Sequence, residues 1–367
     1  MRGAGGRFMR KIRVLVVDDS AFMSKQISCL IEEDEDLKVI GIADDGWEAV
    51  SLVRELKPDV VTWGGEMWKK NGMEALTTIM EQRPTPILML SSLAQAGAST
   101  TIYALLHGAV DFISKPSGSF SFDLYKLKVK AELVSKIKQA AQIPLRNLIM
   151  NNLILPNIDI RKKRSTQNGL AKEFDQILAL GTSTGGPKAL ETVITALPAS
   201  FPYPLLLVQH MPPKFTKSLA ERLNGLSGVR VVEAKHNERL LGGTVYIAPG
   251  DYHMTAVQTS REYRIKLHQK PSWNGFRPSV DVLFDSISQL KNLKRHFILM
   301  TGIGSDGAKG MLSAKQAGAA STMVESKESC IVFGMPKSAI ALNCVDYTVP
   351  LHLITSKIME VTGIRTR

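Results

Sequence analysis

The chain has 367 residues, of which 44% are hydrophobic, and this is enough apolar material for two folded domains. Its formal net charge is +12, and +8 of that charge lies between residues 117 and 172, where eleven Lys/Arg stand against three Asp/Glu. We expect this segment to be mostly linker, and a solvated connector explains its charge as well as a phosphate-binding patch would. The segment shows no zinc-finger spacing, RNA-binding aromatic motif or clear recognition helix, which argues against nucleic-acid binding. No window approaches the roughly 20 apolar residues of a membrane span.

Residues 1–9 contain glycines and arginines but no apolar stretch typical of a secretion signal, and we expect a disordered tail there. The three cysteines, Cys29, Cys330 and Cys344, show neither metal-ligand spacing nor an even disulfide framework. This usage is typical of a protein of the reducing cytoplasm.

Short apolar runs alternate with helical patterns over residues 10–122. The predicted strands are 12–17, 39–43, 60–63, 87–90 and 110–114, and the predicted helices include 20–33 and 46–56. Five strands that alternate with helices predict a doubly wound, flavodoxin-like α/β domain with a parallel sheet.

Residues 123–172 are predicted to form a helix followed by a basic linker. A Lys/Glu-rich helical pattern covers 125–141, and 142–169 has no clear periodicity. Residues 173–367 alternate again, which predicts a second doubly wound parallel sheet of the Rossmann-like type. Its predicted strands include 177–180, 205–208, 229–233, 244–248 and 297–301.

Polar residues follow the strands of the first predicted sheet. Asp18 and Asp19 close the first strand, Ser91 closes the fourth and Lys115 closes the fifth. Such a set at the carboxyl edge of a doubly wound sheet is suited to Mg²⁺ and a phosphoryl group. It resembles the receiver domains of bacterial two-component response regulators. The resemblance implies a phospho-accepting aspartate at the end of the third strand, where this chain has Gly64.

Because glycine has no carboxylate, we expect a degenerate receiver that is not phosphorylated at position 64. Glu66 shares a strand face with that position, but its spacing alone does not make it the acceptor. Trp68 stands where the family usually has a proline. Asp18 and Asp19 either still hold Mg²⁺ or remain as structural remnants, and the second alternative is preferred because two carboxylates without the third make a poorer site.

A glycine-rich segment, Gly181–Gly186, separates an apolar run from a helical pattern that begins at Pro187. Strand, tight turn and helix form the context in which a serine, here Ser183, becomes a nucleophile near free helix N–H groups. The simpler alternative is a glycine loop that turns the chain or binds an anion. A serine nucleophile requires a base and an acid that orients it, so histidines and aspartates at other strand ends decide between the two.

His210 ends one apolar run and Asp306 follows another. The carboxyl ends of parallel strands share one edge, so Ser183, His210 and Asp306 are predicted to converge as a catalytic triad. The alternative role for Asp306 is to cap the helix that follows it. Four histidines of this domain compete with His210, of which His253 is the nearest rival: His236, His253, His268 and His296.

The second domain resembles the chemotaxis protein-glutamate methylesterase family over nearly all of residues 177–355. The segments that carry this resemblance are Gly181–Gly186, Val208–Pro213, Tyr246–Gly250, Arg277–Asp281, Thr301–Gly307 and Ser329–Pro336. It implies hydrolysis of methyl esters on glutamates of chemoreceptor signalling helices, and deamidation of glutamines there. It assigns attack to Ser183, proton transfer to His210, orientation of the imidazole to Asp306 and an oxyanion hydrogen bond to the backbone N–H of Ile303, with no cofactor for catalysis.

The resemblance also implies partners: methyl-accepting chemoreceptors, and a chemotaxis histidine kinase that docks on the receiver. We expect neither nucleic-acid binding nor membrane insertion. Two other functions stay open, a non-catalytic adaptor that binds receptors through the same cleft and a DNA-binding response regulator. Replacement of Ser183 by alanine separates adaptor from esterase, and a salt-dependent DNA shift tests the third hypothesis.

Overall fold

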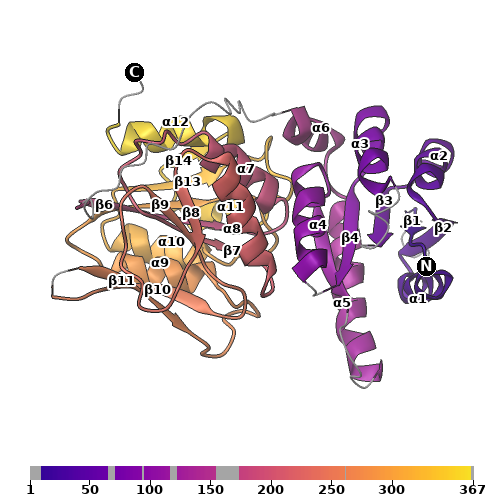
Figure 1. The fold of residues 1–367 in the computed structure, drawn as a ribbon, viewed down its shortest axis with the longest axis horizontal. Coiled ribbons are helices and arrows are strands. Elements are labelled where there is room, and N and C mark those ends of the chain that lie inside the picture. The colour runs from indigo at the N-terminus through magenta and orange to yellow at the C-terminus, as the bar shows by residue number, and fades with distance from the viewer. Residues whose placement is uncertain are drawn as a thin grey trace, which may run out of the picture. The chain divides into compact units, whose positions relative to one another are not determined.

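The computed structural model describes residues 10–64, 71–92, 95–115, 122–153, 173–260 and 262–364. The chain divides into two compact units, residues 1–149 and 150–367, and each is built around one parallel sheet with helices beside it (Figure 1). The two predicted doubly wound α/β domains are thereby confirmed. Among the helices of the described ranges, none has both the length and the apolar character needed to cross a bilayer.

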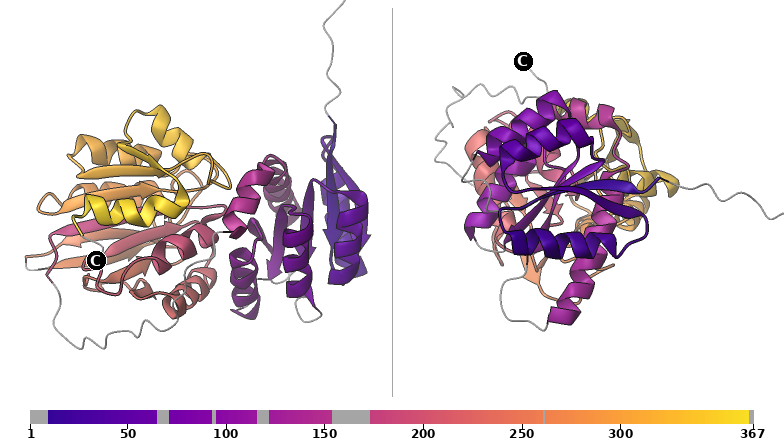
Figure 2. Two further views of the ribbon diagram at one scale, coloured as in Figure 1. Left: turned by 90° about the horizontal axis from the view of Figure 1, so that it is seen from above. Right: turned by 90° about the vertical axis from the view of Figure 1, so that its right-hand side faces the viewer.

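The first unit contains a five-stranded sheet in the order β2-β1-β3-β4-β5. Its strands are β1 (Ile12–Val17), β2 (Leu37–Ala43), β3 (Val60–Gly64), β4 (Ile87–Ser92) and β5 (Asp111–Lys115). Its helices are α1 (Ala21–Glu32), α2 (Gly46–Leu56), α3 (Gly72–Gln82), α4 (Gln95–Leu106) and α5 (Phe122–Ala140), and a further helix, α6 (Leu145–Leu153), begins before the end of this unit at residue 149. Helix α1 packs with α5 and α2 packs with α3, and Figure 2 shows helices on both faces of this sheet. The inner strands are therefore continuous apolar runs, as in other sheets covered on both sides.

The basic helix α5 packs on the first unit. Lys130 lies 2.8 Å from Glu33 and Lys138 lies 2.9 Å from Asp34. The first compact unit therefore extends through residue 149, whereas the sequence suggested a division near residue 122. Helix α6 lies inside the stretch predicted to be linker, and that prediction was wrong for residues 145–153. A helix of nine residues spans fewer than three turns, so its periodicity is weak in the sequence.

The second unit contains a seven-stranded parallel sheet in the order β14-β13-β12-β6-β7-β9-β8. Its strands are β6 (Gln176–Thr182), β7 (Leu205–Gln209), β8 (Arg230–Glu233), β9 (Thr244–Ile247), β12 (Lys294–Leu299), β13 (Ser321–Glu325) and β14 (Tyr347–Val349). Its helices are α7 (Gly186–Thr195), α8 (Phe215–Leu226), α9 (Val280–Ser288), α10 (Ala308–Gln316), α11 (Met335–Ala341) and α12 (Leu351–Val361). Helices α12 and α8 both pack with α7, whereas α9 and α11 both pack with α10.

Three elements of the second unit were not predicted. An antiparallel hairpin of β10 (His253–Gln258) and β11 (Tyr263–His268) packs against α9. Strands β13 and β14 extend the parallel sheet beyond β12. All five residues of β13 are buried although three are polar, so its sequence lacks the apolar run by which buried strands are recognised.

Candidate active site

Ser183 lies in a tight turn between β6 and α7. Gly185 adopts a left-handed φ of 77°, which is accessible to glycine at little steric expense. The N–H of Gly186 donates to the carbonyl of Ser183 at 2.8 Å and closes the turn, and Pro187 stands in the first turn of α7. The N–H of Ser183 donates to the carbonyl of Thr301 at 3.0 Å, which fastens the turn to the segment that follows β12. The predicted strand–turn–helix context is therefore present.

Gly302 leaves the space that the side chain of Ser183 needs. A Cβ atom at position 302 would lie 2.9 Å from the Cβ of Ser183 and 2.2 Å from the sulfur of Met335. The neighbouring Thr301 hydroxyl donates to the carbonyl of Thr184 at 2.9 Å. The nucleophile turn and the loop after β12 are thus packed directly on one another, and no side chain larger than glycine fits between them.

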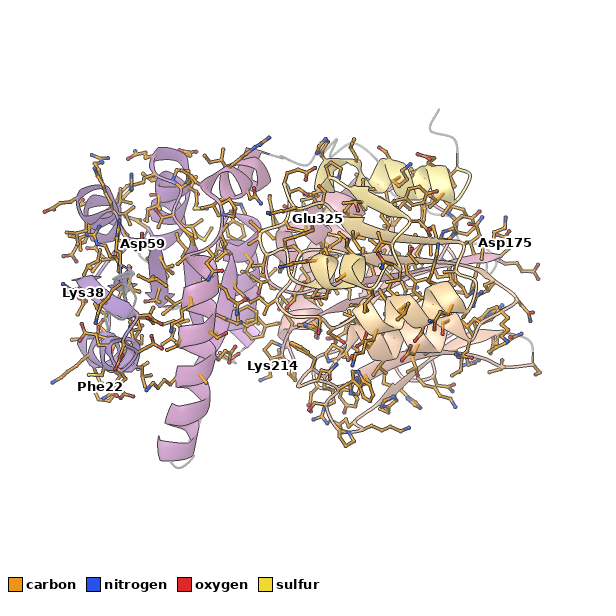
Figure 3. The ribbon with its side chains drawn as sticks, turned by 180° about the vertical axis from the view of Figure 1, so that it is seen from behind. Phe22, Lys38, Asp59, Asp175, Lys214 and Glu325 are labelled. Atoms are coloured by element: carbon orange, nitrogen blue, oxygen red, sulfur yellow. The ribbon has the colours of Figure 1, made fainter. Side chains whose placement is uncertain are left out.

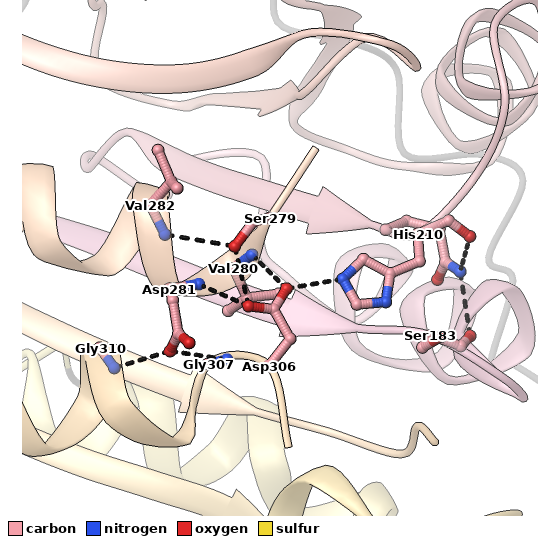
Figure 4. A network of polar contacts seen from close by, with 10 residues as sticks. Ser183, His210, Ser279, Val280, Asp281, Val282, Asp306, Gly307 and Gly310 are labelled. Atoms are coloured by element: carbon pink, nitrogen blue, oxygen red, sulfur yellow. Dashed lines mark hydrogen bonds and ion pairs between the residues drawn. The ribbon is translucent and has the colours of Figure 1, made fainter. Parts of the chain in front are cut away.

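His210 and Asp306 form the central polar contact of the site (Figure 4). The Nε2 atom of His210 lies 2.8 Å from Oδ2 of Asp306, and the two side chains are 7% and 0% exposed. The other ring nitrogen, Nδ1, is buried and makes no hydrogen bond within the part of the chain that the structure describes. In Figure 4 this nitrogen lies on the Ser183 side of the ring, opposite Asp306. The ring is therefore bound to the acid through Nε2 and leaves Nδ1 toward the serine.

Asp306 also receives the N-terminus of α9. Its Oδ2 accepts from the N–H of Val280 at 2.7 Å, and its Oδ1 accepts from the hydroxyl of Ser279 at 2.8 Å and from the N–H of Asp281 at 3.1 Å. Burial acts to raise the pKa of Asp306, but the hydrogen bond and charge of His210 and the donors at α9 outweigh it and hold the pKa below its usual value. The carboxylate therefore stays ionised and favours a proton on Nε2 of His210.

The cap alternative for Asp306 is wrong for the helix that follows it, because the N-cap of α10 is Gly307 and the Asp306 carboxylate binds α9 instead. Asp281 serves α10 in return: its Oδ1 accepts from the N–H groups of Gly307 at 2.9 Å and Gly310 at 2.7 Å. Burial raises the pKa of Asp281 to about 6. Asp281 of α9 thus binds the N-terminus of α10, and Asp306 of the loop before α10 binds the N-terminus of α9; together these contacts fix the loop that carries Asp306.

The rival histidines have other contacts. His253 is buried, and its Nε2 lies 3.2 Å from the carbonyl oxygen of Pro271. His296 is a core residue whose ring nitrogens contact Ser321 and Gln176, and burial lowers the pKa of its imidazole to about 4. His268 is the last residue of β11, and Nδ1 of His236 lies 3.1 Å from the carbonyl oxygen of Leu267 in the same strand. Among the described residues, His210 is the histidine that hydrogen-bonds to Asp306.

A buried acid that the sequence analysis missed supports the nucleophile turn. Glu325 ends β13 inside the second unit (labelled in Figure 3), and its Oε2 accepts from the N–H of Thr301 at 2.9 Å. Ser329 donates to its other carboxyl oxygen at 2.9 Å. Burial raises the pKa of Glu325 to about 7. Both Glu325 and Ser183 therefore bind the backbone of Thr301. The sequence carries no local pattern for this link, because it joins the ends of strands that are far apart in the chain.

The predicted receiver site lies at the carboxyl ends of β1, β3, β4 and β5. Asp18 is buried and accepts from the N–H of Ser20 at 3.1 Å, whereas Asp19 is exposed. A Cβ atom on Gly64 would lie 2.3 Å from Oδ2 of Asp18. The Asp18 carboxylate thus occupies the space in which a side chain at position 64 would begin.

Other predicted receiver positions are only partly described. Ser91 is buried and its Oγ accepts from the hydroxyl of Thr101 at 2.5 Å. Lys115 ends β5, and Glu66 and Trp68 lie outside the described residues. Within the described ranges, no three His, Cys, Asp or Glu side chains are grouped so as to hold a metal ion.

Comparisons with known proteins agree with this architecture. Residues 178–358 match the CheB methylesterase family and residues 14–121 match the response regulator receiver domain. A protein-glutamate methylesterase/protein-glutamine glutaminase of Geobacillus kaustophilus is 43% identical over 97% of this chain and 100% of its own length. One of the same description from Thermotoga maritima is also 43% identical, over 96% of this chain and 99% of its own.

Among solved structures, the CheB methylesterase catalytic domain of Thermotoga maritima matches with a TM-score of 0.50 and 41% identity, covering 52% of this chain and 100% of that one. Identity above 40% extends over both units of the chain rather than over one of them. The chain therefore belongs to the family of protein-glutamate methylesterases/protein-glutamine glutaminases.

Proposed function

We propose that this chain removes methyl esters from glutamates of chemoreceptor signalling helices with Ser183 as nucleophile, His210 as base and Asp306 as the acid that orients the base. One observation carries the assignment of residues. Asp306 binds Nε2 of His210 at 2.8 Å, and Nδ1 is left without a partner among the described residues, on the side of Ser183. A base held in this way accepts a proton only at Nδ1.

The reaction follows from these positions. Nδ1 of His210 takes the hydroxyl proton of Ser183 as Oγ attacks the ester carbonyl, and the Asp306 carboxylate stabilises the imidazolium that forms. The imidazolium then gives its proton to the departing methoxide oxygen, so methanol leaves and an acyl-serine remains. Water, deprotonated by the same Nδ1, attacks the acyl-serine and releases glutamate with the serine restored.

Stabilisation of the oxyanion is assigned to the backbone N–H of Ile303. Within the described part of the chain this N–H donates no hydrogen bond, and the next residue, Gly304, has a left-handed φ of 85°. The turn that carries Ser183 leads directly into the N-terminus of α7, where the helix dipole also favours negative charge. A donor of this kind is worth roughly 3 to 4 kcal/mol of the barrier.

The same residues account for glutamine deamidation, the second activity in the names of the relatives. Ammonia then takes the place of methanol and receives the proton from the imidazolium. Nucleophile, base, acid and oxyanion donor all come from the chain, so the chemistry needs no cofactor.

The receiver is assigned a docking role without phosphorylation at position 64. Gly64 has no carboxylate, and Asp18 fills the adjoining space. We assign the chemoreceptors and a chemotaxis histidine kinase as its partners, and the cytoplasm as its compartment. The three cysteines are free thiols, which agrees with a reducing compartment.

Methanol release from methylated receptor membranes tests the function, with the full chain, Ser183→Ala and a matched control, Ser260→Ala, at an exposed position. We expect the full chain and the control to release methanol at equal rates and Ser183→Ala to release it more slowly by a factor of roughly 10⁴ or more. Equal release by all three would overturn the assignment of Ser183. No release by any folded protein would support the non-catalytic adaptor.

A further inference from the structure

One face of the His210 ring is covered by Phe276. The two ring centroids are 3.9 Å apart and the ring planes differ by only 8°. Phe276 is half-buried and belongs to the segment between β11 and α9, residues 269–279, which we call the aromatic loop. A parallel stack this close fixes the plane of the imidazole, whereas Asp306 holds only its Nε2 edge.

The backbone that carries Phe276 is a tight two-residue turn. Asn274 and Gly275 have φ values of 50° and 86°, both left-handed. The N–H of Trp273 donates to the carbonyl of Phe276 at 3.0 Å, and the N–H of Phe276 donates back at 2.9 Å. An Asn-Gly pair with two positive φ values is the preferred sequence for such turns. The position of the Phe276 ring therefore depends on a rigid local structure.

The aromatic loop is also fastened at its base. Arg277 donates through Nε to Asp251 at 2.9 Å, and Gln269 donates to the other oxygen of the same carboxylate at 3.0 Å. His253 contacts the carbonyl of Pro271 at 3.2 Å. These contacts join both ends of the loop to the segment that precedes and begins β10, so the loop does not depend on His210 for its conformation.

We propose that Phe276 is a positioning residue for His210. A ring hydrogen-bonded only through Nε2 is free to tilt about that bond, and Nδ1 would then lose its direction toward Ser183. The stacked phenyl ring blocks this tilt. Its π-face also attracts the imidazolium that forms when Nδ1 takes the proton. Phe276 therefore favours the transition state more than the ground state and acts on kcat.

This inference rests on the proposed function, and its test uses the full chain with a small substrate, the γ-methyl ester of N-acetylglutamate N′-methylamide. Phe276→Leu removes the ring, and Phe276→Tyr keeps it. Trp273→Leu is the matched control, because Trp273 lies in the same turn with its side chain 50% exposed. We expect kcat to fall about tenfold in Phe276→Leu, with KM within twofold, and to be restored in Phe276→Tyr. The control should keep the wild-type kcat.

Nuclear magnetic resonance of the histidine rings gives a second readout that general packing does not move. In the wild type we expect upfield-shifted ring protons for His210 and one tautomer with the proton on Nε2. In Phe276→Leu the upfield shift should vanish and the ring signals should broaden. A Phe276→Leu kcat within twofold of wild type would overturn the inference. So would an equal loss of kcat in Phe276→Tyr.

The two proposals fail in different ways. If Ser183→Ala still hydrolyses the small ester at the wild-type rate, the proposed function is wrong. If Ser183→Ala is inactive but Phe276→Leu is unimpaired, the triad stands and only the role of Phe276 is rejected.

Discussion

Replacement of Asp306 by asparagine tests the triad most directly, because it keeps the shape of the side chain and removes its charge. All four contacts described for this carboxylate come from donors: His210, Ser279 and the N–H groups of Val280 and Asp281. An asparagine has one oxygen and one NH₂ group for these four donors. Whichever way it is turned, its NH₂ group faces a backbone N–H.

The two orientations of the asparagine amide impair catalysis in different ways. With NH₂ in the Oδ1 position it faces Asp281 N–H and Ser279, and with NH₂ in the Oδ2 position it faces Val280 N–H and His210. In the second orientation the imidazole accepts at Nε2 only if its proton moves to Nδ1, and Nδ1 then no longer serves as a base. In the first, the negative charge that stabilises the imidazolium is lost. We expect kcat to fall by about 10⁴, equivalent to about 5.5 kcal/mol in the barrier, with little change in KM.

The assay is methanol release under saturating substrate, with Asp285→Asn at an exposed position of α9 as a matched control that should keep the wild-type rate. Circular dichroism and a denaturation curve establish that the variant is folded. A folded Asp306→Asn protein with more than a tenth of the wild-type kcat would refute the reasoning, because the base would then work without its acid.

Three further predictions concern the surroundings of the site and the receiver. Gly302→Ala places a methyl group 2.9 Å from the Ser183 Cβ, so kcat should fall about 100-fold and the free energy of unfolding by about 1–3 kcal/mol; an active and equally stable variant would contradict the packing described. The pKa of Asp281 is raised from 3.8 to about 6 in the folded protein. Its ionisation therefore lowers the free energy of unfolding progressively between pH 3.8 and pH 6, by an amount that stays constant above pH 6, and has no effect below pH 3.8. Asp281→Asn should therefore gain about 3 kcal/mol of stability relative to wild type between pH 4 and pH 8, measured by urea unfolding, and parallel pH–stability curves would reject this. Incubation with acetyl phosphate and Mg²⁺ should add no acid-stable or acid-labile phosphoryl mass at Gly64, and an 80 Da adduct mapped to β3 would show the prediction to be wrong.

Local sequence was sufficient for the elements whose signals are local. The five strands of the first sheet and helix 46–56 were predicted close to their bounds, because buried strands flanked by turn residues are recognisable as short apolar runs. Strand β13 was missed for the opposite reason: three of its five residues are polar, so it has no apolar run. Its Glu325 is held by a contact with the distant Thr301, and such a contact leaves no pattern in the local sequence.

The sequence by itself also determined that Ser183, His210 and Asp306 lie at one sheet edge, because parallel strands all end on the same side. Only the tertiary structure decided which nitrogen of His210 binds Asp306, that His253 contacts the carbonyl of Pro271 instead, and that Phe276 covers the imidazole. The parallel direction of the strands follows from their alternation with helices. The direction of a ring nitrogen depends instead on the packing of a loop 66 residues further along the chain, and no spacing in the sequence records it.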